Sequence, residues 1–105
     1  DTLDVLAVTY NQDKLDIYVD VEGEVAIATI NFMDGLYFAQ IYVDQVKNIS
    51  GEASAHTALI NTHLPGMLST AFDTILSARY DGNFDVESIS VRDNRLYVTL
   101  IYLAP

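Results

Sequence analysis

Apolar and polar residues alternate most regularly between positions 14 and 24. The apolar members of this pattern are Leu15, Ile17, Val19 and Val21. A period of two is typical of a β-strand that has one face in the core and the other in water. An apolar run over 3–10 precedes this strand, and the polar residues 11–14 separate the two. The pattern therefore predicts a β-hairpin at the start of the chain.

Two further strands are predicted over 24–32 and 36–46. Asp34-Gly35 lies between them, and this dipeptide supplies the positive φ that a tight turn needs. Apolar residues occur on both faces of these strands, as in a sheet that is covered on both sides. We therefore expect another element to cover the second face.

The covering element is predicted to be a helix over 65–79. Pro65 suits its first turn, and apolar residues recur along it with helical spacing. The apolar stripe comprises Leu64, Met67, Leu68, Ala71, Phe72, Ile75 and Leu76. The alanines of 53–61 allow a second, shorter helix, which Pro65-Gly66 would separate from the long one.

A last hairpin is predicted over 84–92 and 95–103, with Asp93-Asn94 as its turn. The apolar residues change face within its first strand, which predicts a β-bulge near Glu87-Ser88. The element order is then ββββ-α-ββ. This is an α+β fold, with an antiparallel sheet of about six strands packed against one long amphipathic helix.

Length and composition predict one domain over residues 1–105. Half of the residues are apolar and only 19% are charged, which excludes a disordered chain. This apolar content exceeds what a small core needs. No apolar run reaches the roughly 18 residues of a membrane span, so no transmembrane segment is expected.

The net charge of the chain disfavours two classes of partner, nucleic acids and anionic membranes. Fifteen acidic residues against five Lys and Arg give a net charge of -10, which repels nucleic acid and anionic membranes. The absence of Cys excludes disulfides and thiolate chemistry. The chain begins with Asp1 rather than Met, which predicts a processed chain or a fragment of a longer exported protein.

The sequence predicts neither a catalytic site nor a metal site. His56 and His63 stand without an HExxH motif or a Cys, so we interpret them as surface or helix-end residues. No G-x-S-x-G motif marks a nucleophile. The acidic residues match no EF-hand loop, and their alternation on a strand is typical of a solvated face. We expect no enzyme activity and no cofactor.

The segments "HLPGMLSTAFDTILSARYDGNFDVESISVRDNRLYVTL" and "MDGLYFAQIYVDQVKNISG" carry a family resemblance. Their layout resembles small exported bacterial proteins of the tubular lipid-binding (TULIP-like) kind. The resemblance covers about 13–100 and implies a helix across a curved sheet, with apolar groups between them that hold an acyl chain. It also implies an extracytoplasmic or secreted protein without catalytic activity.

Two functions follow as hypotheses. The first is a non-enzymatic module of the cell envelope or extracellular space that binds a lipid or another hydrophobic ligand, with Phe38, Met67, Phe72 and Ile75 lining the site. The second is a structural or interaction subunit, in which apolar surface or a sheet edge meets a partner protein or a second copy. For any one apolar residue, the simpler alternative is ordinary core. The sequence does not identify the ligand or the partner.

Overall fold

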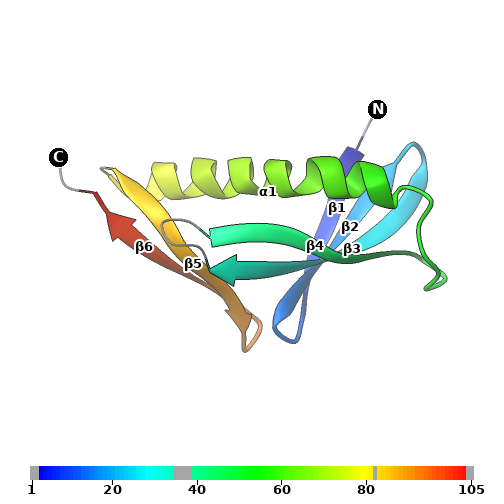
Figure 1. Ribbon diagram of the computed structural model, residues 1–105, viewed down its shortest axis with the longest axis horizontal. Coiled ribbons are helices and arrows are strands. Elements are labelled where there is room, and N and C mark those ends of the chain that lie inside the picture. The colour runs from blue at the N-terminus through cyan, green and yellow to red at the C-terminus, as the bar shows by residue number, and fades with distance from the viewer. Residues whose placement is uncertain (1–2, 35–38, 82, 104–105) are drawn as a thin grey trace.

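The predicted α+β fold and the element order ββββ-α-ββ are confirmed (Figure 1). The structure, a computed structural model, describes residues 3–34, 39–81 and 83–103. The elements are β1 (Leu3–Asn11), β2 (Lys14–Val21), β3 (Glu24–Asp34), β4 (Ala39–Asn48), α1 (Thr57–Arg79), β5 (Phe84–Arg92) and β6 (Arg95–Tyr102).

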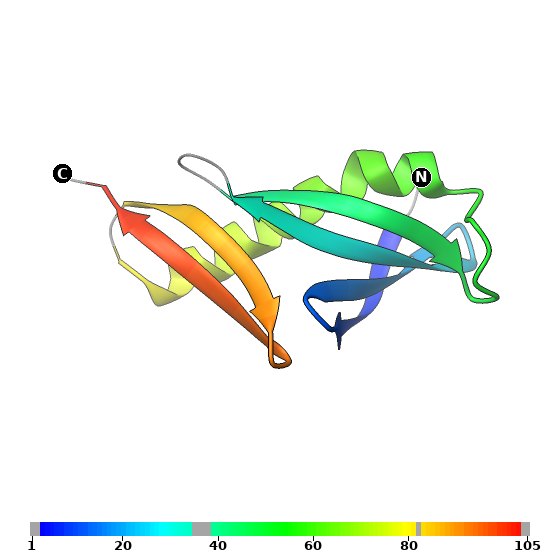
Figure 2. The same ribbon diagram turned by 60° about the horizontal axis from the view of Figure 1, so that its bottom comes forward.

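The strands form two antiparallel sheets rather than the single sheet expected. β1, β2, β3 and β4 are neighbours in that order, and β5 pairs with β6 alone. Figure 2 shows the β5–β6 hairpin set apart from the four-stranded sheet. The hairpin nevertheless packs against the larger sheet, because Val91 of β5 belongs to the same buried cluster as the core residues of β2 and β3.

The turns follow the predicted turn chemistry. Asp93 and Asn94 both have positive φ, 53° and 56°, as a two-residue hairpin turn requires. Gly23 has a φ of 89°, at the turn between β2 and β3. The predicted bulge is confirmed by a register shift between Val86 and Ser88. For the turn predicted at Asp34-Gly35, Asp34 ends β3 and Gly35 lies outside the described residues.

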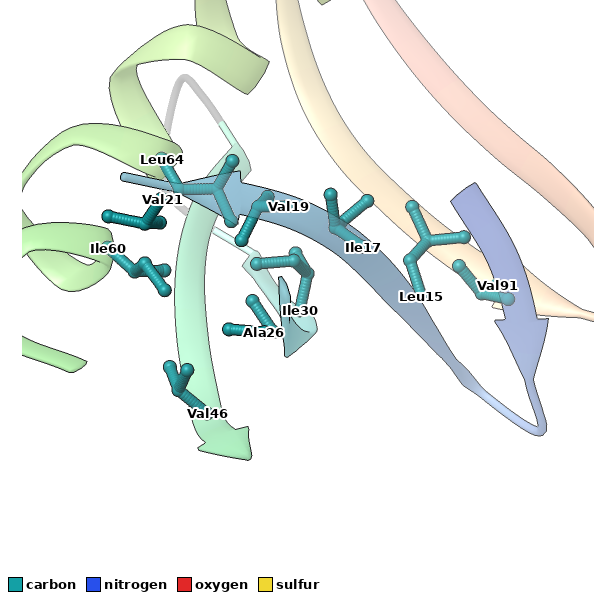
Figure 3. Packing of buried hydrophobic residues seen from close by; sticks show 11 residues of the cluster. Leu15, Ile17, Val19, Val21, Ala26, Ile30, Val46, Ile60, Leu64 and Val91 are labelled. Atoms are coloured by element: carbon teal, nitrogen blue, oxygen red, sulfur yellow. The ribbon is translucent and has the colours of Figure 1, made fainter. Parts of the chain in front are cut away.

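The core lies on one face of β2 and β3, as the alternation predicted. Every second residue of β2 is buried, and Ala26, Ala28 and Ile30 of β3 lie beside them in the antiparallel register. Figure 3 shows this cluster, with Ile60 and Leu64 of α1 at one end and Val91 of β5 at the other. The sheet thus supplies the centre of the core, and the helix and the hairpin close its two ends.

Helix α1 is one continuous helix, so the break predicted at Pro65-Gly66 is wrong. Pro65 lies inside the helix and cannot donate a hydrogen bond to the carbonyl of Asn61. Ile60 and Leu64, both fully buried, hold the turns before the proline against the core. Their burial offsets the lost hydrogen bond, and the predicted short helix becomes the first part of α1.

The predicted apolar stripe of α1 is buried only in part. Leu64 and Leu76 are buried, whereas Met67 and Ile75 remain 40% and 57% exposed. The reason is the position of the helix: its first half lies over the four-stranded sheet, and its second half continues toward the β5–β6 hairpin (Figure 1). The stripe is therefore covered unevenly, with exposed residues between and beside the buried ones.

The molecule is elongated, with extents of 48 × 30 × 22 Å and a radius of gyration of 14.7 Å. A compact domain of this length has a radius of gyration of about 13 Å. No helix in the described part of the chain combines the length and the apolar character needed to cross a membrane.

Candidate apolar binding groove

An apolar groove of about 220 Å³ lies between α1, the β1–β2 hairpin and the start of β6. Its lining residues are Val8, Tyr10, Leu15, Ile17, Leu68, Ala71, Phe72, Ile75 and Leu96. The Tyr10 hydroxyl is the only polar side-chain group among them. We refer to this site as the apolar groove.

The strand register explains one wall of the groove. Val8 of β1 is paired with Ile17 of β2, and Tyr10 with Leu15, so these four side chains share the inner face of the sheet. Ile17 and Leu15 are buried, but Val8 and Tyr10 are 53% and 44% exposed. The core face of the sheet therefore continues onto β1 without a cover.

The opposite wall is the second half of α1. Leu68, Ala71, Phe72 and Ile75 recur with helical spacing and so lie on one side of the helix. The ring of Phe72 packs against the ring of Phe32 of β3, with centroids 6.2 Å apart in an edge-to-face arrangement. This contact packs the ring of Phe72, which lines the groove, against β3.

The groove continues along the helix into a second hollow of about 480 Å³. The two share Phe72, Ile75 and Leu96, and the second is bounded at its end by Arg79 and Tyr80. A hollow of about 370 Å³ on the other side of Phe72 is more polar, because Asp73 and Asp85 contribute to its lining. The apolar groove and its extension are therefore the surface best suited to an apolar chain.

The structure brings two of the four predicted site residues together. Phe72 and Ile75 line the apolar groove. Met67 lines a separate hollow, with Leu3, Leu59 and His63 as its other lining residues. Phe38 lies outside the described residues.

Sequence reasoning missed the wall that β1 contributes. Val8 and Tyr10 belong to the first apolar run of the chain, which the sequence pattern predicts only as one strand of a hairpin. The run has apolar residues on both faces, and this was the available signal that one face borders something other than water.

The acidic residues of β2 have structural partners. The carboxylate of Asp16 accepts hydrogen bonds from the Thr29 hydroxyl, at 2.8 Å, and from the Asn11 side-chain amide, at 3.2 Å. The Asp20 carboxylate accepts one from the backbone N–H of Gly23, at 2.9 Å, which secures the turn after β2. These contacts stabilise the outer face of the sheet and lie outside the lining of the groove.

Two other contacts in the described part of the chain involve titratable groups. The Lys14 ammonium group donates a hydrogen bond to Asp44 at 2.8 Å, and this contact raises the pKa of Lys14. The imidazole of His56 lies 3.5 Å from the Glu24 carboxylate. Within residues 3–34, 39–81 and 83–103, no three His, Asp or Glu side chains are grouped so that they could hold a metal ion.

Comparison with known proteins adds no family to this description. No family model matches the chain, and no curated protein and no solved structure is significantly similar to it. The resemblance to tubular lipid-binding proteins stays a prediction from the sequence layout.

Proposed function

We propose that this protein is a non-enzymatic binding module for a lipid or another hydrophobic ligand, in the cell envelope or extracellular space. The proposal rests on the apolar groove. Its lining includes the buried residues Leu15 and Ile17 and the exposed apolar residues Val8 and Ile75. Binding of a ligand that removes such apolar surface from water lowers the free energy of the complex.

The chemistry of the lining indicates which part of a ligand would be bound. None of its side chains is charged, so the groove suits an apolar chain and leaves a polar headgroup in solvent. Each methylene group that becomes buried contributes about 0.8 kcal/mol. Affinity should therefore increase with chain length until the groove is full, and binding within the uncharged groove should depend little on salt.

A tryptophan at position 71 tests the proposal. Ala71 is exposed and lines the groove, so Ala71→Trp should fill the site without disturbing the core. We expect the wild type to bind the neutral fluorescent dye Nile red and to release it to fatty acids, increasingly well as their chains lengthen. Ala71→Trp should weaken dye binding at least tenfold.

The matched control is Ala58→Trp. Ala58 is also exposed on α1 but does not line the groove, so this variant should bind the dye as the wild type does. Circular dichroism establishes that both variants are folded. Equal binding by the two variants, or no binding by the folded wild type, would contradict the proposal.

The second candidate function, an interaction subunit, is favoured by a different observation. All residues of β1 from Asp4 to Asn11 are exposed, although β1 is part of the sheet. β1 is therefore a more direct contact surface for a partner protein than the groove is.

A further inference from the structure

Strand β1 forms one edge of the four-stranded sheet, and its outer side has no neighbouring strand among the described residues. An unpaired edge presents free backbone N–H and C=O groups to any strand that can align with it. Apolar side chains project from the same strand: Val5, Leu6, Val8 and Tyr10 are each more than 40% exposed. The strand thus offers hydrogen bonds and apolar surface together.

The usual protections of an edge strand are weak in β1. Residues 3–11 contain no Lys and no Pro, and Asp4 is their only charged residue. A register shift between Val5 and Ala7 interrupts the first half of the strand, but Ala7 to Asn11 pair with β2 without interruption. The opposite edge, β4, differs because Asp44 and Lys47 lie in it and Lys47 bridges to Ala53.

We propose that β1 pairs antiparallel with β1 of a second copy of this chain, with the two-fold axis at Thr9. Antiparallel pairing of identical strands is two-fold symmetric, so one surface serves as both halves of the interface. In this register Val8 lies opposite Tyr10 of the second copy, and aromatic with β-branched pairs are favourable across strands. The inference goes beyond ligand binding and does not depend on it.

The surface area of the molecule supports a partner of this size. The chain exposes 6773 Å², whereas a compact monomer of 11.6 kDa exposes roughly 5,800 Å². The difference of roughly 1,000 Å² is comparable to the ~800 Å² per partner that a stable protein interface buries. A second copy can therefore account for this excess.

Charge determines how the association should respond to salt. Each copy has a net charge of -10, so two copies repel one another over long distances. The repulsion arises away from β1, which has one acidic residue, and salt screens it. The dimer fraction should therefore rise as sodium chloride is added, unlike that of a complex held by ion pairs.

A single cysteine tests the interface, because the chain has none of its own. At the two-fold axis the two copies of residue 9 have Cα atoms about 4.5–5.5 Å apart, within the range that a disulfide bridges. We expect Thr9→Cys to form a covalent dimer under mild oxidation. Thr74→Cys is the matched control, since Thr74 is exposed on α1 and lies on no strand edge, and it should stay monomeric.

Sedimentation equilibrium of the unmodified chain provides the independent measurement. We expect a monomer–dimer equilibrium that shifts toward the dimer with salt, and Val8→Lys should reduce association at least tenfold. Ile49→Lys, at a residue 68% exposed outside β1, should leave it unchanged. A folded wild type that stays monomeric into the millimolar range, or equal cross-linking of Thr9→Cys and Thr74→Cys, would overturn the proposal.

Discussion

Leu64 and Met67 stand three residues apart on the same apolar stripe of α1, but their environments differ. Leu64 is fully buried among residues of β2, β3 and β4, whereas Met67 is 40% exposed. The cost of removing an apolar side chain depends on the contacts and the cavity that it leaves behind. The two positions therefore measure how far the core extends along the helix.

We expect Leu64→Ala to lower the free energy of unfolding by about 2–5 kcal/mol, the range for a large core residue replaced by alanine. Met67→Ala should lower it by less than about 1 kcal/mol, because an exposed side chain loses few contacts. Urea denaturation of both variants measures the difference. Equal losses would mean that the core reaches beyond Leu64.

The difference in burial between Leu64 and Met67 could not be predicted from the sequence. Helical spacing places Leu64, Met67 and Ile75 on one side of α1, and this was predicted correctly. Periodicity does not reveal whether a covering element extends that far. The exposure of Met67 and Ile75 on a stripe that also holds the buried Leu64 is a property of the tertiary arrangement, and the exposed Ile75 lines the apolar groove.

At the level of elements, local rules predicted the strands better than the helix. Alternation located β2, and the positive φ of Asp93 and Asn94 matches the turn predicted for β5–β6. The continuity of α1 was missed because a proline normally ends a helix. Packing of Ile60 against the core outweighed that preference, and only the three-dimensional structure shows the packing.

Gly66 allows a direct test of the continuous helix. Its φ lies outside the positive range, and a Cβ atom added there would meet no atom within 4 Å. Because glycine is less favourable than alanine inside a helix, Gly66→Ala should stabilise the protein by about 0.5–1 kcal/mol. Thermal unfolding followed by circular dichroism measures the effect. A lower melting temperature would indicate that the helix is interrupted at this residue.

At the level of the whole molecule, the apolar groove and the edge of β1 are two parts of one exposed apolar region. Val8 and Tyr10 belong to both, since they line the groove and lie on the edge strand. The elongated shape leaves this region open along one side of α1. We expect the groove part of this region to accept an apolar chain.

Isoleucine methyl signals in the nuclear magnetic resonance spectrum report directly on binding in the groove. Ile17 and Ile75 line the groove, whereas Ile49 is 68% exposed elsewhere and serves as an internal control for nonspecific binding. On titration with the neutral ligand dodecanol, we predict saturable shifts of the Ile17 and Ile75 signals and no shift of the Ile49 signal. Unchanged groove signals, or shifts that are equally large at Ile49, would contradict the account.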